Sequence, residues 1–319
     1  MRSTRVFRVA ALVTTVLATA AATVVTTQAV GADRSAHAPL AEAVSHVNRS
    51  TQWTLARRIK LDFPTYHPQG FARVGNRLFL SSVEIIEAPV KYPAPVDGYD
   101  RTPGKGRGHV FVLDLQGNLI KDIVLGEGHM YHPGGIDADA TSLWVPVAEY
   151  RPRSHAIVYR IDLRTLTVHE AFRAADHVGG VVPDPTTGRV HGVTWGSREF
   201  YVWNGTGKEL SHAVNTSHFL DYQDCANADR RTMLCTGITA YKTATGADFE
   251  LGGVAVLDLD SHAARHEAPI QQWSAAGHVA TRNPVHLETD HGTLRMWAAP
   301  DDGEERAGTE ILVYETTVG

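Results

Sequence analysis

Histidines recur in this sequence at the start of similar short motifs. The motifs HPQG, HPGG and HVGG begin at His67, His132 and His177, and an apolar stretch follows each of them. Imidazoles that converge from several segments can bind a transition metal, or can transfer protons near neutral pH. These three side chains can act together only if the fold brings their segments to one place.

The motifs belong to a repeat of the whole sequence. His132 and His177 are 45 residues apart, and the same spacing leads on to Tyr222, beside a weaker copy of the motif. The interval from His67 to His132 is 65 residues because it contains a Pro/Gly-rich insertion, residues 84–108. A last weak copy follows near residue 283. Self-similarity at such a period indicates a repeat architecture.

Each repeat contains short strand-like runs separated by polar turns. The predicted second strands cover residues 77–84, 142–149, 189–195, 232–239 and 294–300. The predicted third strands cover residues 109–115, 156–163, 198–204, 252–260 and 310–315. Four short strands per unit are typical of propeller blades. We therefore predict an all-β, five-bladed β-propeller, with six blades as the alternative if residues 84–108 hide a degenerate blade.

The two ends of the repeat array complement each other. The last unit ends at residue 315 without a fourth strand, and residues 53–63 form a strand-like run without a unit of its own. Pairing the two would remove an exposed sheet edge. We expect this N-terminal strand to complete the last blade and close the ring.

In a propeller the ends of the innermost strands meet at one rim, so equivalent repeat positions converge. We predict His67, His132 and His177 as catalytic residues, and the same three with His286 as metal ligands. The strand-end carboxylates Glu84 and Glu149 are added to the catalytic set, because a carboxylate can orient an imidazole. The predicted substrate-binding residues are His129, Trp195, Gln223, Asp224, Asn283 and Asp301.

This arrangement allows two kinds of chemistry. One divalent ion (zinc, iron or calcium) could activate a bound water, or the imidazoles alone could act as general acid and base. A structural role for the histidines stays open, because the chain contains 17 of them. The leading hypothesis is a hydrolase or lyase that acts on a small lactone- or ester-like substrate. The alternatives are a non-enzymatic binding propeller and a glycosidase that uses Glu84, Glu149 and Asp301.

Several other functions are disfavoured. The sequence has no phosphate-binding glycine loop, no dinucleotide fingerprint and no G-x-S-x-G elbow, so no nucleotide cofactor is expected. Its net charge is -5 and its basic residues are scattered, which does not fit a nucleic-acid partner. We expect a small-molecule ligand and a monomer.

The inner-strand segments HPQGFARVGNRLFLSS, HPGGIDADATSLWVPV and HVGGVVPDPTTGRVHGV carry a resemblance to known proteins. They resemble the superfamily of gluconolactonase/regucalcin-like, paraoxonase-like and strictosidine-synthase-like propellers. That resemblance implies six blades and a calcium site of Glu, Asn and Asp, whereas this chain has five repeats and histidines at those places. The pattern is also similar to a family of exported bacterial proteins, which implies no particular activity.

The N-terminus predicts export. Three arginines, a long uncharged run rich in Ala and Thr, and small residues indicate a signal peptide over residues 1–32, cleaved near Ala32 or Ala38. A membrane anchor is the alternative, since the run is long enough to span a bilayer. We expect a disordered lead-in at 33–52, one propeller domain at 53–319, and a secreted protein without a lipid anchor or later membrane segment.

The sequence contains two cysteines, Cys225 and Cys235. They flank a short polar turn, so they can face each other across a hairpin and be oxidised after export. A disulfide is favoured over a two-cysteine metal site or a pair of buried thiols.

Overall fold

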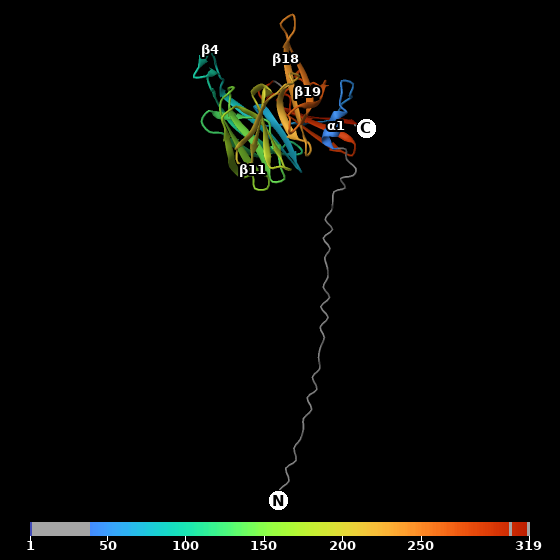
Figure 1. Ribbon diagram of the computed structural model, residues 1–319. Helices are drawn as coiled ribbons and strands as arrows, with labels where there is room; N and C mark the ends of the chain where they lie inside the picture. Colours follow the sequence, from blue (N-terminus) through green and yellow to red (C-terminus); the bar gives the residue numbers. More distant parts are fainter. Residues whose placement is uncertain (2–38, 306–307, 318–319) are drawn as a thin grey trace. The chain divides into compact units, whose positions relative to one another are not determined.

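The computed structural model describes residue 1 and residues 39–305 and 308–317, so the predicted signal peptide and its cleavage sites lie outside the described residues. Its strands form five antiparallel sheets in succession, arranged as a five-bladed β-propeller (Figure 1). The prediction of an all-β propeller with five blades is confirmed.

In blades 1, 3 and 4 the strands run outward in sequence order, and the first strands of the blades lie next to one another. Blade 1 contains β2 (His67–Val74), β3 (Arg77–Glu87), β6 (Lys105–Asp114) and β7 (Leu119–Leu125). Blade 2 contains β8 (Met130–Pro133), β9 (Asp137–Ala138), β10 (Ser142–Glu149), β11 (Ala156–Asp162) and β12 (Val168–Ala174). Blade 3 contains β13 (Val178–Asp184), β14 (Arg189–Thr194), β15 (Glu199–Asn204) and β16 (Glu209–Val214), with the short 3-10 helix η2 (Trp195–Ser197).

The last two blades follow the same plan. Blade 4 contains β17 (Asp221–Asn227), β18 (Thr232–Lys242), β19 (Asp248–Asp258) and β20 (Ala264–Ile270). Blade 5 contains β21 (Val285–Asp290), β22 (Thr293–Ala298), β23 (Glu310–Thr317) and, from the other end of the chain, β1 (Thr54–Lys60). Strand β1 pairs antiparallel with β23. The predicted exchange of an N-terminal strand into the last blade is therefore observed.

The predicted insertion contains more regular structure than its Pro/Gly content indicated. Strands β3 and β6 continue pairing as far as Glu87 and Lys105, and the residues between them form the hairpin of β4 (Lys91–Val96) and β5 (Tyr99–Arg101). We call residues 88–104 the arm. It has two strands and no place in the ring, so it is not a sixth blade. The arm and the hairpin of β18 and β19 project on the same side, which we call the upper face (Figure 1).

The predicted lead-in is ordered where the structure describes it. Helix α1 (Leu40–Ser45) precedes β1, and its residues Ala41 and Val44 pack with Val47 against blades 4 and 5. Leu40 and Val44 are one turn apart on the same face of the helix, and Val47 follows just after its end. The expectation of disorder over residues 33–52 is therefore wrong for residues 39–52, because this apolar face contributes to the core.

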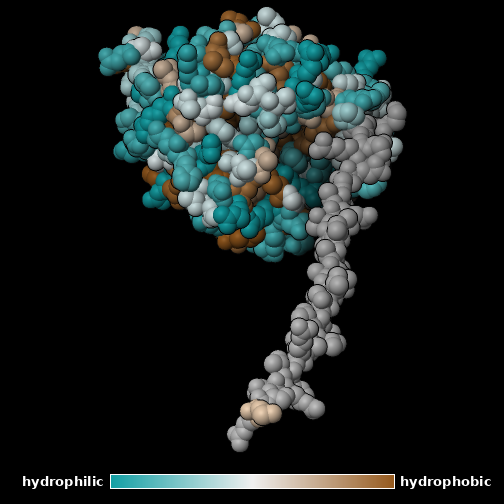
Figure 2. All heavy atoms as spheres, turned by 60° about the horizontal axis from the view of Figure 1, so that its bottom comes forward, coloured by the Kyte–Doolittle hydropathy of each residue, from teal (hydrophilic) through white to brown (hydrophobic). Residues whose placement is uncertain are grey.

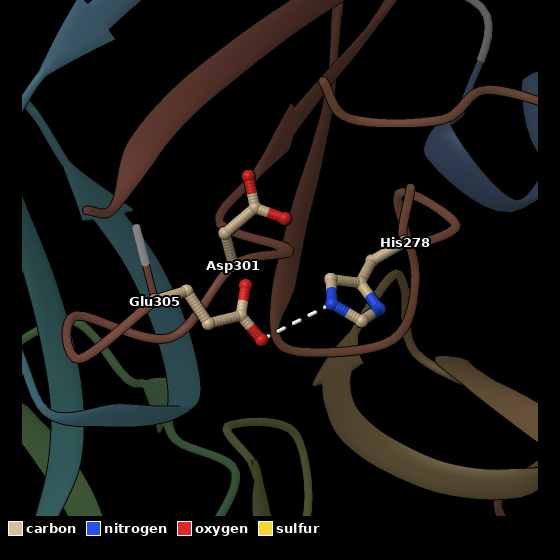
Figure 3. A group of neighbouring side chains, drawn as sticks. All are labelled: His278, Asp301 and Glu305. Carbon is tan, nitrogen blue, oxygen red and sulfur yellow. Dashed lines mark ion pairs between the residues drawn. The ribbon is translucent and has the colours of Figure 1, made fainter. Parts of the chain in front are cut away.

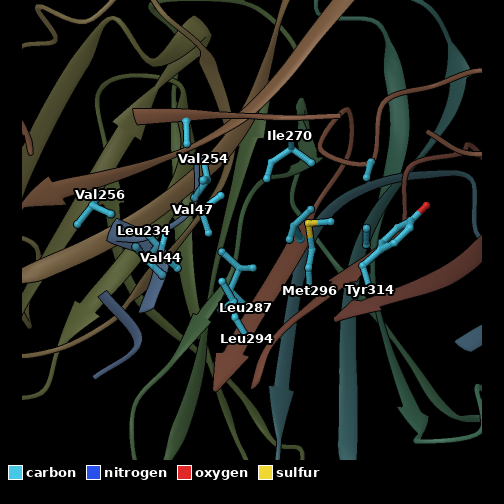
Figure 4. Packing of buried hydrophobic residues seen from close by; sticks show 14 of the residues in the cluster. Val44, Val47, Leu234, Val254, Val256, Ile270, Leu287, Leu294, Met296 and Tyr314 are labelled. Carbon is cyan, nitrogen blue, oxygen red and sulfur yellow. The ribbon is translucent and has the colours of Figure 1, made fainter. Parts of the chain in front are cut away.

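The core lies between the blades, since each blade buries its two faces against its neighbours. All eight residues of β10 are buried, whereas β7 and β16 at the blade edges are mostly exposed. Figure 4 shows one such cluster, in which Val44 and Val47 meet side chains of blades 4 and 5. On the face shown in Figure 2 hydrophilic residues predominate and hydrophobic ones are scattered. Among the described residues no helix is long and apolar enough to cross a membrane.

The two cysteines form the predicted disulfide. Cys225 in β17 and Cys235 in β18 are directly opposite each other in the ladder, with Cα atoms 4.1 Å apart and an S–S distance of 2.01 Å.

Candidate functional site

The repeated glycines bring the inner strands into direct contact. A Cβ atom at Gly70 would lie 2.7 Å from the carbonyl oxygen of Gly134, and the N–H of Gly135 donates to the carbonyl of Gly179 at 2.8 Å. Residues without a side chain permit this close approach. The inner strands of blades 1 to 3 therefore meet near the axis, and the histidine of each motif is placed just above that contact.

A pocket of about 260 Å³ lies there, on the upper face. It is lined by His67, Gln69, His132, Tyr150, His177, Gly179, Thr194, Trp195, Gly196, Asp221, Tyr222 and Gln223. The three motif histidines thus meet in one pocket, together with two of the predicted substrate-binding residues, Trp195 and Gln223.

His67 is held by a carboxylate from blade 5. Its Nδ1 lies 2.6 Å from Oδ1 of Asp302, which also accepts a hydrogen bond from the Asn283 amide at 2.9 Å. Burial acts to raise the pKa of Asp302, but the contacts with His67 and Arg282 outweigh it and lower that pKa. Asp302 is therefore ionised near neutral pH and can only accept, so Nδ1 of His67 carries the proton. Asp302 engages Nδ1 and leaves Nε2 of His67 for other partners.

His177 and His132 are buried, with only 5% and 6% of their surface exposed. Burial lowers the pKa of His177 to about 4, and burial together with the nearby His177 and His67 lowers the pKa of His132 well below 6.5. His177 donates its Nδ1–H to the main-chain carbonyl of Glu149 at 2.7 Å, so its Nε2 is an acceptor. Nε2 of His132 is buried without a partner among the described residues, and its ring stacks on Tyr150.

Three predicted residues lie outside the pocket. Glu84 pairs with Arg107 at 3.3 Å, and His129 is exposed in the turn before β8. The carboxylate of Glu149 binds Arg151 at 2.6 Å and lies 3.2 Å from Nδ1 of His155, so the prediction that it orients a pocket imidazole is wrong. Its main-chain carbonyl performs that role for His177. Long charged side chains at strand ends reach nearby arginines on a neighbouring strand or loop, which the repeat register does not indicate.

Three others support the site or lie elsewhere. Both oxygens of Asp224 accept main-chain N–H groups, from Phe71 at 2.7 Å and Ile136 at 3.1 Å, so it joins blade 4 to blades 1 and 2 beneath the pocket. Asn283 is buried and acts through Asp302. His286 does not line the pocket, and its nearest charged partner is Glu288, at 3.9 Å.

Asp301 belongs to a separate cluster on the upper face, shown in Figure 3. Within residues 39–305 and 308–317, His278, Asp301 and Glu305 are the group of three whose donor atoms all lie within 4.8 Å of one another. Arg282 already binds Glu305 at 2.9 Å and Asp302 at 3.3 Å, which makes the cluster an ion-pair network. The pocket histidines do not form such a compact group, and zinc would need their nitrogens about 2.0–2.1 Å from one point. The metal site at His67, His132, His177 and His286 stays a prediction.

The sequence reasoning missed residues that complete the pocket. The predicted site residues include Asp301 but not its neighbour Asp302. Tyr150 follows the predicted residue Glu149, and Tyr222 precedes the predicted residue Gln223, but no other feature of the sequence pointed to either tyrosine. The arm also reaches the pocket. The guanidinium of Arg101 lies 4.8 Å from the ring centre of Trp195, and that of Arg151 lies 3.4 Å from the ring centre of Tyr99.

Comparisons with known proteins add a family and leave the chemistry open. One protein family, described as a family of unknown function (DUF6454), matches residues 33–318. No curated protein matches the sequence. The resemblance to gluconolactonase-like and paraoxonase-like propellers stays an expectation.

Several solved structures are similar. Hydrazine synthase of Kuenenia stuttgartiensis is 13% identical over 77% of this chain, with a TM-score of 0.38, and this chain spans 58% of that one. A luciferin-regenerating enzyme is 10% identical, with 82% and 96% of the two chains covered and a TM-score of 0.45. A DUF4221 family member from Bacteroides vulgatus is 12% identical, with 83% and 97% covered and a TM-score of 0.38.

Proposed function

The chain belongs to the DUF6454 family of unknown function, and from that premise we propose that its histidine-lined pocket is the active site of an exported hydrolase or lyase. The substrate is a small organic molecule of the lactone or ester type. The observation that carries this proposal is the 2.6 Å contact between Nδ1 of His67 and Asp302, on a ring that lines the pocket.

His67 acts as the general base. Its Nε2 takes a proton from a water molecule, which attacks the carbonyl carbon, or from a carbon next to that carbonyl in an elimination. The imidazolium that forms is stabilised by the ionised Asp302, and it returns the proton to the leaving oxygen. Positioned proton transfer of this kind contributes about 10²–10⁴-fold to a rate.

His132 and His177 remain neutral during the reaction. Their low pKa values, caused first by burial, keep positive charge off both rings near neutral pH. Nε2 of His177 accepts a hydrogen bond from the substrate or from the attacking water, and thereby orients it towards His67.

The glycosidase alternative finds less support. It needs two or more carboxylates beside the bond that is cleaved. Glu84 and Glu149 are engaged by arginines, and Asp301 accepts a hydrogen bond from Ser274 at 2.6 Å. None of the three lines the pocket.

The test compares wild type with His67→Gln and Asp302→Asn on a panel of p-nitrophenyl esters and small lactones. We expect kcat/KM to fall by about 10²–10⁴-fold in both variants, with unchanged circular dichroism. His212→Gln is the matched control, because His212 forms a similar 2.7 Å pair with Glu199 on blade 3 and lies outside the pocket. Equal turnover by wild type and His67→Gln would refute the proposal and favour a binding propeller.

A further inference from the structure

The pocket is rich in hydrogen-bond acceptors. Nε2 of His67 and Nε2 of His177 both have free lone pairs, because the Nδ1 atoms of these rings are taken by Asp302 and by the Glu149 carbonyl. His132 adds a nitrogen that is buried without a partner in the described chain. An unsatisfied buried polar atom is unfavourable, and a ligand that donates a hydrogen bond to it removes that cost. These imidazole nitrogens therefore favour a ligand with several hydrogen-bond donors.

The charges around the pocket point to a cationic ligand. No lysine or arginine is among its lining residues, whereas Asp221 is. The guanidinium of Arg198 lies 3.7 Å from Asp221, which is long for a charge-assisted hydrogen bond. The guanidiniums at the mouth are neutralised, since Arg101 pairs with Asp100 at 2.8 Å and Arg151 pairs with Glu149. Among the lining residues an anionic ligand would find no lysine or arginine, and the nearby guanidinium of Arg198 faces Asp221.

The walls of the pocket also suit a cation. Tyr150, Trp195 and Tyr222 line it, and aromatic faces attract ammonium and guanidinium groups. The chain itself provides an example, because the Arg101 guanidinium already lies over the Trp195 ring.

We propose that the pocket takes a small organic molecule bearing a protonated primary amino group. The three N–H donors of the ammonium bind Nε2 of His177, the buried nitrogen of His132 and the Asp221 carboxylate, so Nε2 of His67 stays available as the base, and the organic part lies against Tyr150 and Trp195. This inference rests on the proposed function for its substrate class. Within that function the substrates are esters or lactones that carry an amine.

The first experiment measures binding, so it does not depend on turnover. Benzylamine, benzyl alcohol and benzoate are similar in shape and carry positive, zero and negative charge at pH 7.5. Each is titrated into the whole protein and followed by calorimetry and by the NMR signals of the histidine rings. We expect benzylamine to bind at least tenfold more tightly than benzyl alcohol, and benzoate to bind more weakly than either. Equal affinities, tighter binding of benzoate, or no binding of benzylamine would overturn the inference.

Variants then locate the bound amine. Asp221→Asn should weaken benzylamine at least fivefold and leave benzyl alcohol within twofold. Asp260→Asn is the matched control, because this exposed carboxylate lies in the turn after β19, at the other end of its blade. If both variants bind benzylamine like wild type, the ammonium is not at Asp221 and the assignment fails.

Turnover separates this inference from the proposed function. The methyl esters of 3-aminopropanoate and 3-hydroxypropanoate differ only in the group that the pocket would recognise. Selective binding of benzylamine without hydrolysis of either ester would leave the inference standing and remove the enzymatic proposal. Equal hydrolysis of both esters would support the enzyme and refute the amine preference.

Discussion

One buried carboxylate connects three blades beneath the pocket, and its removal gives the sharpest test of the fold. Asp224 is 4% exposed, and its two oxygens accept the main-chain N–H groups of Phe71 and Ile136. Asp224→Ala leaves both donors buried without a partner, at about 1–3 kcal/mol each, or roughly 2–6 kcal/mol together. With about 2–4 °C lost per kcal/mol in a domain of this size, Tm should fall by about 4–24 °C.

Thermal unfolding followed by circular dichroism measures this loss. Asp224→Asn should also destabilise, because one carboxylate oxygen is replaced by an NH₂ group that faces a main-chain donor. Asp260→Ala removes an exposed carboxylate of the same blade and should change Tm by about 1–2 °C at most. A Tm of Asp224→Ala within 2 °C of wild type would refute the idea that this side chain holds the inner strands together.

The pH dependence provides a second readout. Burial raises the pKa of Asp224 well above 3.8, and it raises the pKa of nearby Asp137 to about 7. When folding raises the pKa of a carboxyl group, the protonated group stabilises the fold fully at pH values below its pKa in the unfolded chain, about 3.9. That stabilisation is lost as the pH rises through the pKa of the folded state. The Tm difference between wild type and Asp224→Ala should therefore shrink as the pH rises above about 3.9. A difference that grows with pH would contradict this assignment.

Three further predictions concern other parts of the ring. The Cys225–Cys235 disulfide closes a short loop, and its reduction should lower the free energy of unfolding by about 2–3 kcal/mol. Dithiothreitol should therefore lower Tm. An unchanged Tm with both thiols free would contradict this. Gly134→Ala places a Cβ against the carbonyl of the next inner strand and should cost about 1–3 kcal/mol or more. Gly205→Ala, which meets no atom closer than 3.6 Å, should unfold like wild type. Burial lowers the pKa of His191 to about 4. The stability due to its neutral form is therefore present above pH 6.5 and lost as the pH falls towards 4. Between pH 6.5 and 4, His191→Gln should lose less Tm than wild type does.

The strands were predictable because each carries its own local signal. The apolar run at 142–149 coincides with β10, and the unpaired run at 53–63 contains β1. The repeat period then placed three histidines on one rim, since equivalent positions in successive blades converge. Both inferences needed only alternation and spacing along the chain.

The partners of the histidines were not predictable in the same way. His67 and Asp302 are 235 residues apart, and no motif joins them. Asp301 and Asp302 are adjacent, yet one points to Ser274 and the other to His67. The path of a loop after a strand decides between such neighbours, and it depends on packing between blades. Helix α1 was missed for a different reason, since it is only six residues long and has too few apolar residues for a clear helical pattern.

The pairing of β1 with β23 has a consequence for how the sequence relates to the ring. Thr54 at the start of β1 is the direct partner of Glu315 near the end of β23, so the two ends of the propeller strands lie side by side. A covalent link there would produce a circular ring of blades that can be cut at any exposed turn, such as residues 205–208 between β15 and β16. The natural order of the blades is therefore one of several circular permutations of the same structure.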